Sequence, residues 1–521
     1  MTPAGRRALR AAAAPLAGAG LALAFPRPGW SALAVPSLAV LFALAGSARP
    51  RRAAAEGFAG GFVFFSLLLR WFAAVILEHT PLGGGAAAGA VLASGALLAA
   101  GWAAAAWLAA RTGPGAALAS AAILWVAYER LREAVPAPFP WGVLAAAFAG
   151  SAPGRVLARS VGSAGISLLA ASLAAVLASF LLRRPRRFAA ALGWGAVALA
   201  AAAAGLALPA GQRERARVAV VQGAVPAEAA AVEKFEVYAG LTRRAAARGA
   251  RLVVWPESAT GLRIDADRAY RRAVERLAAE TGTDILLGSV TGRGSRWFNS
   301  AVLVRADVGM ATVSAKRVLV PFGEYLPLRP LLGEVPALAA EAGDFSPGAS
   351  AVLHPARVGR IGALVCYEAV FPGLALEFAR EGASFLANLT NDTWFGWTSG
   401  PFQHLAHAVL RAPETGRPLL RAANGGISVI VDADGTVEGR LGLGERGVIV
   451  ADVAPGGGAP VGAAVGRAVA WACVILSFAL LVSGVRHDRS GPPRRAPAGL
   501  PERPGHPPER PDTAPDGCEH A

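Results

Sequence analysis

Long apolar segments are the feature that most limits what this chain can fold into. A helix needs about 20 mainly apolar residues to cross a bilayer, and eight segments of this sequence come close to that length. Seven of them lie before residue 210, and one lies near the C-terminal end. They cover residues 8–25, 30–47, 57–78, 86–110, 114–132, 162–182, 188–209 and 462–485. The sequence therefore predicts an α-helical transmembrane bundle of about eight spans.

The composition agrees with a membrane protein. Hydrophobic residues make up 54% of the 521 residues, and charged residues make up only 17%. This balance is more apolar than that of an ordinary soluble protein. The formal charge of +16 would also suit a nucleic-acid partner, but the arginines lie beside the apolar segments, without a zinc knuckle, an RNP motif or a basic helix with interleaved aromatic residues. We therefore expect a membrane-embedded protein that does not bind nucleic acid.

The arginine clusters predict how the chain crosses the membrane. Cytoplasmic loops of membrane proteins carry an excess of lysine and arginine. Here the clusters precede the first apolar segment and follow the second, sixth and eighth, at residues 6–10, 49–52, 183–187 and 486–495. The first segment has no convincing small-residue cleavage site, so we expect a retained span rather than a signal peptide. Both termini are then cytoplasmic, and the segment after the seventh span lies on the opposite side.

Residues 210–458 have a different character from the apolar segments. Short β-branched runs such as "RVAVVQG", "RLVVWPES" and "RIGALVCYE" alternate with helical patterns, which predicts an α/β domain of layered sheets and helices. The predicted organisation is a seven-span bundle over residues 1–209, this domain, and a C-terminal transmembrane helix over residues 459–485. The proline- and arginine-rich residues 486–521 are expected to form a disordered cytoplasmic tail.

One cysteine stands where a nucleophile could act. Cys366, Cys473 and Cys518 are the three cysteines, and this odd number without a close pair indicates neither a disulfide framework nor a zinc site. Of the three, Cys366 alone lies in the α/β domain, directly after an apolar strand pattern. A cysteine at a strand end can act as a nucleophile if a base and an oxyanion-stabilising group lie near it. The alternative is a small buried hydrophobic residue.

Charged residues at other predicted strand ends are candidates for those partners. Glu257 follows the apolar run "VVWP", Lys316 and Glu324 stand eight residues apart around "RVLVPFG", and Glu368 comes two residues after Cys366. A carboxylate can take the proton of a thiol, and a fixed ammonium can stabilise an oxyanion. Each residue alone could be a solvated charge or, for Lys316, an incidental lysine. Their shared position beside prolines and glycines at strand ends favours a common site.

Several motifs resemble the nitrilase superfamily, whose Glu-Lys-Cys triad acts on carbon–nitrogen and acyl bonds. They are "VWPES", "KRVLVPFGEYLP", "CYEAVFP" and the long run over residues 388–428 that begins "NLTNDTWFGW". The apolar segments on both sides and "VQGAVP" at the start of the domain narrow the resemblance to a membrane-embedded bacterial branch, the apolipoprotein N-acyltransferase family. The chain departs from the pattern of many relatives at Ser314, Val318 and near Phe235, where they carry an aromatic residue, a histidine and a tryptophan.

The resemblance implies a fold and a set of site residues. The domain is expected to be a nitrilase-like αββα sandwich on the periplasmic side of the bacterial inner membrane. Glu257 matches the general base, Lys316 the oxyanion-stabilising lysine and Cys366 the nucleophile. Glu324 and Glu368 match acidic residues that support the active site.

The resemblance also implies the substrates. These are a phospholipid acyl donor and, as acceptor, the free α-amine of diacylglyceryl-cysteine on an apolipoprotein, with no cofactor. Trp394, Phe395 and Trp397 are candidates for a lipid-facing rim, because tryptophan favours the membrane interface. Ordinary domain core is the alternative for these three. The sequence does not indicate the oligomeric state.

Two other interpretations of the function remain open. A membrane-tethered nitrilase-type amidase would use the same triad with water in its second step. A multi-span transporter or receptor would have no need of the triad. His404 and His407 stand three residues apart and could face one metal ion, but no third ligand accompanies them, so no metal site is expected.

Overall fold

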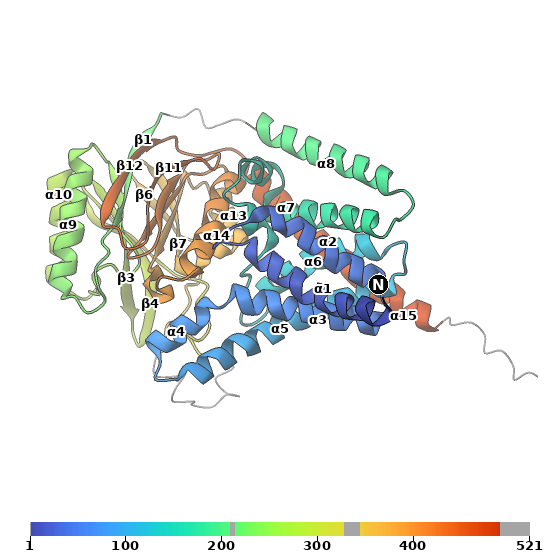
Figure 1. The fold of residues 1–521 in the computed structure, drawn as a ribbon. Helices are drawn as coiled ribbons and strands as arrows, with labels where there is room; N and C mark the ends of the chain where they lie inside the picture. Colours follow the sequence, from blue (N-terminus) through green and yellow to red (C-terminus); the bar gives the residue numbers. More distant parts are fainter. Residues whose placement is uncertain (1, 209–213, 328–343, 490–521) are drawn as a thin grey trace, which may run out of the picture.

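The computed structural model describes residues 2–208, 214–327 and 344–489. A helical bundle forms one end of the molecule, and a domain built from two sheets forms the other (Figure 1). The long helices of the bundle are α1 (Pro3–Leu23), α2 (Ala34–Gly46), α3 (Pro50–Leu68), α4 (Trp71–His79), α5 (Gly84–Arg111), α6 (Ala117–Ala134), α7 (Ala152–Leu181), α8 (Arg187–Ala207) and α15 (Val461–Arg489).

Helices occur at each predicted apolar segment, but the count of about eight spans is not confirmed. Four described helices are long and apolar enough to cross a membrane, namely α5, α7, α8 and the Val461–Ser483 part of α15. Helices α3 and α4 make a fifth candidate as a pair bent by 49°. The apolar parts of α1 and α2 are shorter, and α6 ends in a charged stretch that contains Glu129, Arg130, Arg132 and Glu133. The apolar runs therefore predicted helices more reliably than spans.

Helix α7 is broken where α15 crosses it. Gly162 has φ +64° and ψ −178°, which are not helical angles. A Cβ atom at Gly162 would lie 2.4 Å from the carbonyl oxygen of Gly462, so the crossing requires glycine. The break frees the backbone N–H of Ser163, which donates a hydrogen bond to Oε1 of Glu414 at 2.6 Å. A carboxylate from the sheet domain thus caps a helix of the bundle.

Two six-stranded sheets form the other end of the molecule. The first sheet has the strand order β12 (Gly447–Val453), β1 (Ala216–Gln222), β2 (Leu252–Val254), β3 (Asp284–Arg293), β4 (Arg296–Arg305) and β5 (Gly309–Ala315). The second has the order β11 (Val437–Leu441), β10 (Ser428–Val431), β9 (Leu419–Ala423), β8 (Phe385–Thr390), β7 (Gly359–Val365) and β6 (Leu353–Ala356). In each sheet the central three strands are parallel and the outer pairings are antiparallel.

Helices cover the outer face of each sheet, which gives the four layers that the sequence predicted. Apolar residues such as Val220, Leu286 and Val365 fill the space between the sheets. Helices α9 (Ala231–Ala247) and α10 (Arg268–Thr281) pack on the first sheet. Helix α10 begins where the Asp267 side chain accepts hydrogen bonds from the N–H groups of its first turn, as an N-cap does.

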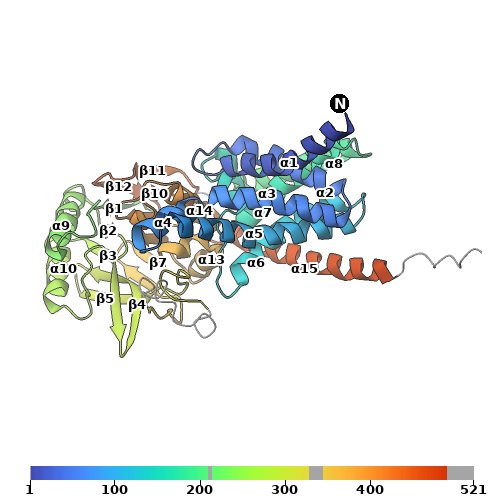
Figure 2. The same cartoon turned by 60° about the horizontal axis from the view of Figure 1, so that its bottom comes forward.

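Helices α13 (Pro372–Arg380) and α14 (Gly400–Thr415) lie between the second sheet and the bundle. The core of the bundle continues into this layer, because Tyr367, Phe371 and Leu410 belong to the same apolar cluster as the bundle helices. Figure 2 shows the N-terminus and the end of α15 at the end of the bundle that lies away from the sheets. Helix α15 continues to Arg489, and the rest of the predicted tail lies outside the described residues.

Candidate active site

Cys366 lies at the point where β7 ends and the short 3-10 helix η3 (Cys366–Val370) begins. Its φ is +53°, a left-handed value that costs a non-glycine residue about 1–2 kcal/mol. Two side chains hold this backbone in place through the Cys366 carbonyl oxygen. Asn388 Nδ2 donates to that oxygen at 3.2 Å, and His404 Nε2 lies 3.1 Å from it. The strained turn is therefore fixed by its surroundings, as is common at active sites.

Glu257, Lys316 and Glu324 meet near this turn as the sequence predicted, and Asn299 joins them. Lys316 Nζ lies 2.8 Å from Oε2 of Glu324 and 3.8 Å from Oε1 of Glu257. Asn299 Nδ2 donates to Oε1 of Glu257 at 2.6 Å and to Oε1 of Glu324 at 2.8 Å. We call Glu257, Asn299, Lys316 and Glu324 the front cluster. Its two carboxylates face one ammonium, so one negative charge is left over.

Backbone groups fix both carboxylates of the front cluster. The N–H of Asn391 donates to Oε2 of Glu257 at 2.9 Å, and the N–H of Val320 donates to Oε2 of Glu324 at 2.8 Å. Asn299 itself lies on β4 and was not singled out from the sequence. The signal that could have found it is a polar residue within an apolar strand, where an amide needs polar partners.

Glu368 ties the loop after Lys316 to the strand that precedes Cys366. Its Oε1 accepts hydrogen bonds from the N–H groups of Arg317 at 2.7 Å and Val318 at 3.2 Å. Its Oε2 accepts one from the N–H of Val365 at 2.8 Å. Glu368 therefore positions the segments that carry Lys316 and Cys366, which agrees with the supporting role expected for it.

Burial and charge set the protonation of the reactive groups. Burial raises the pKa of Glu257, and the nearby Glu324 carboxylate raises it further, whereas Lys316 lowers it. Burial also raises the pKa of the Cys366 thiol, and Glu257 adds to this effect while Lys316 opposes it. For Lys316, burial alone would lower the pKa, but Glu324, Cys366 and Glu257 together raise it. Burial and Glu257 thus favour the neutral thiol of Cys366, and the neighbouring carboxylates favour the ammonium form of Lys316.

A second buried group lies on the side of the Cys366 carbonyl oxygen and consists of Asn388, Asp392, His404 and Arg421, which we call the rear network. Arg421 donates to Asn388 Oδ1 and to Asp392 Oδ2, and His404 Nδ1 lies 2.9 Å from Asp392 Oδ1. Burial disfavours the charge on Asp392, but Arg421 and His404 outweigh it and lower the pKa of Asp392 to about 2. Burial lowers the pKa of His404. The sequence suggested only metal binding as a possible role for His404. In the structure its ring nitrogens instead contact Asp392 and the Cys366 carbonyl oxygen.

The three aromatic rim candidates have different surroundings. They lie on and just after η4 (Asp392–Phe395). Trp394 and Trp397 are 47% and 77% exposed. Phe395 instead packs into the bundle, with its ring centroid 4.8 Å from that of Trp71. Of the three, only the tryptophans are therefore free to contact lipid.

The loop between α6 and α7 joins the bundle to the active site. The hydroxyl of Tyr367, the residue next to Cys366, donates to the Pro138 carbonyl oxygen at 2.9 Å. Trp141 Nε1 donates to Gln403 Oε1 at 2.7 Å, and the N–H of Gly142 donates to His407 Nε2 at 3.3 Å. His407 thus serves the contact between bundle and domain, a role that its sequence spacing did not indicate.

Comparisons with known proteins agree with this arrangement. The family model described as "Carbon-nitrogen hydrolase" matches residues 217–461, and the one described as "Apolipoprotein N-acyltransferase N-terminal domain" matches residues 17–176. The fold and the site define a carbon–nitrogen hydrolase domain joined to a membrane-embedded helical bundle. Within this class, the chain belongs to the apolipoprotein N-acyltransferase family.

Two relatives support the assignment to this family. The apolipoprotein N-acyltransferase of Geobacter metallireducens is 34% identical over 480 residues, which cover 88% of this chain and 92% of the relative. That of Methylococcus capsulatus is 34% identical over 436 residues, with 80% and 84% covered. Among solved structures, the chain is similar to an amidase from Nesterenkonia sp., with 21% identity, a TM-score of 0.38 and coverage of 47% of this chain and 92% of that chain.

Proposed function

We propose that this protein transfers a fatty acyl chain from a membrane phospholipid to the N-terminal α-amine of diacylglyceryl-cysteine on apolipoproteins, through a thioester on Cys366. The family supports the reaction. The observation that carries the proposal is the placement of Cys366 beside the front cluster, in a domain whose apolar core continues into the bundle. Both lipid substrates would reach such a site from the membrane.

The first half-reaction forms the thioester. Glu257 takes the proton of the Cys366 thiol, and the thiolate attacks the carbonyl carbon of the phospholipid ester. Lys316 stabilises the oxyanion that develops, and its effect is large because the site is buried. The intermediate then breaks the carbon–oxygen bond to glycerol. Glu257 returns the proton to the leaving oxygen, and a lysophospholipid departs.

The second half-reaction moves the acyl chain to the acceptor. The α-amine attacks the thioester carbonyl, and Glu257 takes the proton that the nitrogen loses. The Cys366 thiolate leaves as the new amide forms, and Glu257 then returns the proton to sulfur. Glu324 and Glu368 hold Lys316 and the neighbouring backbone through both steps.

The arginine clusters and the arrangement of the bundle support a proposed position of the active site relative to the membrane. We place the protein in a bacterial inner membrane with eight spans, cytoplasmic termini and the sheet domain on the periplasmic side. The N-terminus and the end of α15 both lie at the end of the bundle away from the sheets, which supports this orientation (Figure 2). Trp394 and Trp397 would then contact the outer leaflet beside the site.

Mass spectrometry of the acyl intermediate tests the proposal. Detergent-purified protein is incubated with a defined phospholipid, and the peptide that contains Cys366 is examined for a hydroxylamine-labile acyl group. We expect the adduct in the unaltered protein and its absence in Glu257→Gln. When a synthetic diacylglyceryl-cysteine peptide is then added, the acyl group should disappear from Cys366, and the mass of the peptide should increase by one acyl group.

Two other outcomes would contradict the proposal. With folded protein and accessible lipid, no adduct and no lysophospholipid would refute phospholipid as the donor. If water removes the adduct as fast as the peptide does, the protein is a hydrolase, as the alternative of a membrane-tethered amidase requires. A matched variant, Glu381→Gln, changes an exposed glutamate outside the site and should behave like the unaltered protein.

A further inference from the structure

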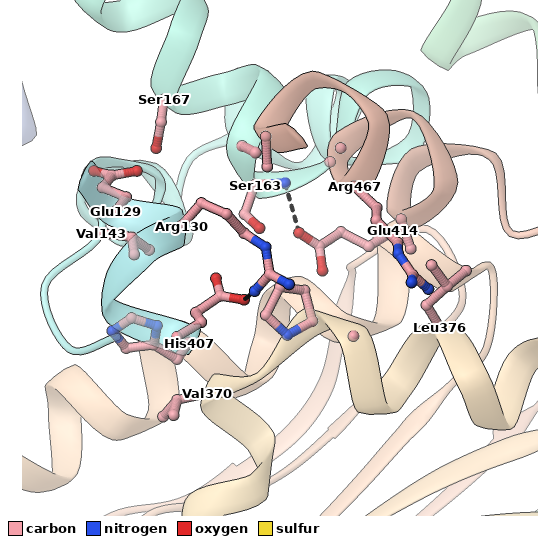
Figure 3. Close-up of a pocket in the computed structure, with 18 of the residues that line it drawn as sticks. Glu129, Arg130, Val143, Ser163, Ser167, Val370, Leu376, His407, Glu414 and Arg467 are labelled. Atoms are coloured by element: carbon pink, nitrogen blue, oxygen red, sulfur yellow. Dashed lines mark hydrogen bonds and ion pairs between the residues drawn. The ribbon is translucent and has the colours of Figure 1, made fainter. Parts of the chain in front are cut away.

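A cavity of about 200 Å³ lies between the bundle and the sheet domain (Figure 3). Its walls come from the bundle helices α6, α7 and α15 on one side, and from η3, α13 and α14 on the other. Glu257, Lys316 and Cys366 do not line it. The cavity is therefore separate from the proposed catalytic group, and nothing in the proposed reaction uses it.

The charged groups of the cavity leave a surplus of hydrogen-bond donors. Arg130 pairs with Glu133, and Arg411 Nη2 lies 3.0 Å from Glu414 Oε2. Arg411 is only 1% exposed, yet its Nε and Nη1 have no hydrogen-bond acceptor within the described residues. Arg467 lines the same cavity and forms no ion pair in the described part of the chain.

Each carboxylate of the cavity has a partner, although Glu414 Oε2 has only its ion pair with Arg411 and no hydrogen bond in the described part of the chain. Glu414 also accepts the hydrogen bond from the N–H of Ser163 that is drawn in Figure 3. Glu129 lies apart from Arg467 in the same view and accepts hydrogen bonds from Trp125 Nε1 at 2.8 Å and the N–H of Leu144 at 2.7 Å. Within the described residues, the two unused donors of Arg411 outnumber the one buried carboxylate oxygen of the cavity without a hydrogen bond, which favours an anionic ligand.

The helix that carries Arg467 indicates where such an anion comes from. Trp471, Ile475 and Phe478 follow Arg467 at intervals of four, eight and eleven residues, so the four side chains share one face of α15. Those three apolar residues are 41%, 67% and 67% exposed. The Arg130 guanidinium lies 4.7 Å from the centre of the Trp471 ring and joins this face to the cavity. The charged site thus opens onto an apolar surface that an acyl chain can cover.

We propose that this cavity binds the phosphate of a membrane phospholipid, whose acyl chains lie along the exposed face of α15. The lipid at this site is a bound structural component rather than the acyl donor. Because the cavity residues come from both the bundle and the sheet domain, the bound lipid holds these two parts together. Arg467 and Arg411 supply the donors to the phosphate oxygens.

Lipid-dependent thermal stability tests the proposal without relying on turnover. The full chain with Cys366→Ala is delipidated in a nonionic detergent, and tryptophan fluorescence follows unfolding with added dioleoylphosphatidylglycerol or dioleoylglycerol. These lipids share their acyl chains but differ in the phosphate. We expect the phospholipid to raise Tm by about 3 °C through preferential binding to the folded state, and dioleoylglycerol to raise it by less than about 1 °C.

Substitutions then assign the effect to the cavity. Arg467→Ala should remove at least about half of the shift, and Arg467→Lys, which keeps the charge, should retain most of it. Arg70→Ala is the matched control, because Arg70 is an exposed arginine at the break between α3 and α4 that does not line the cavity. It should keep the full shift.

Three outcomes would overturn the proposal. An unchanged shift in Arg467→Ala would show that the lipid binds elsewhere. An equal loss in Arg70→Ala would indicate unspecific attraction of lipid to arginine. A shift of the same size with soluble glycerophosphoglycerol would show an anion site that does not need a membrane lipid. None of these results depends on acyl transfer, so they do not bear on the proposed reaction.

Discussion

The front cluster and the rear network are two buried polar groups on either side of Cys366, and they differ in how their charges balance. The rear network pairs the Asp392 carboxylate with the Arg421 guanidinium, and burial favours a neutral His404. The front cluster has two carboxylates for the single ammonium of Lys316. A group whose charges balance is suited to holding the backbone in place. A carboxylate without a counter-charge can instead accept a proton. The comparison therefore distinguishes residues that hold the backbone of Cys366 in position from residues that take part in the proposed reaction.

Removal of the proposed nucleophile or the proposed base should have the largest effect on activity. We expect Cys366→Ala and Glu257→Gln each to lower the rate of lysophospholipid release by at least about 1,000-fold, because each removes a group that forms or breaks bonds. Tm should stay the same or rise in Glu257→Gln, since the raised pKa of Glu257 means that its buried charge opposes folding at neutral pH. More than a tenth of the normal rate in either variant would contradict the front cluster's role.

A change in the rear network should instead lower stability. Asp392→Asn leaves the Arg421 guanidinium buried without a counter-charge, and we expect a loss of about 3–5 kcal/mol in the free energy of unfolding. Denaturant unfolding in detergent measures it. The double substitution Asp392→Asn with Arg421→Met removes both charges and should recover part of the loss. Equal stability of Asp392→Asn and the unaltered protein would mean that the network does not support the fold.

Glu324→Gln should have an intermediate effect that falls on catalysis. Glutamine can still accept the hydrogen bond from Val320, but it removes the carboxylate that lies 2.8 Å from Lys316 Nζ. We expect kcat to fall about 100-fold with little change in KM, because Lys316 is then less well held for the transition state. A change in KM alone would place Glu324 in substrate binding instead.

His354 belongs to neither group, so its effect on stability can be measured apart from both. Burial lowers the pKa of His354 to about 4, and its ring nitrogens lie 2.7 and 2.8 Å from the hydroxyls of Thr312 and Ser314. An unfolded histidine binds a proton at a higher pH, so the folded protein should lose stability as pH falls from about 6.5 towards 4, by up to about 3 kcal/mol. His354→Gln should flatten this dependence between pH 7 and 5. An unchanged slope would exclude His354 as its source.

The sequence predicted the residues of the front cluster better than those of the rear network. Glu257 and Lys316 of the front cluster, like the neighbouring Cys366, follow strands, where a polar residue is conspicuous, whereas Asn299 of the same cluster lies within β4 and was not predicted. Asn388 and Arg421 lie within strands β8 and β9, and their partners become visible only when the strands are placed side by side. Spacing alone could therefore not separate a supporting His404 from a metal ligand.

The fold shows the same division between local and long-range causes. Each helix of the bundle could be predicted because apolar length is a local property of the chain. The break at Gly162 could not, because that glycine lies in a run of small residues whose pattern does not differ on its two sides. Its cause is α15, which packs against Gly162 from the far end of the sequence.

This break at Gly162 also bears on the order in which the chain can be assembled during synthesis. Since α15 causes the break, α7 can form a regular helix before α15 is made, and the Ser163 amide exchanges its helical acceptor for Glu414 only afterwards. The place that Gly462 occupies against α7 is empty until the last helix arrives. The helices that are made first therefore remain incompletely packed in the membrane until the sheet domain has been translocated and folded. A ribosome that stalls before residue 462 would therefore leave a bundle in which α7 lacks its contact with α15.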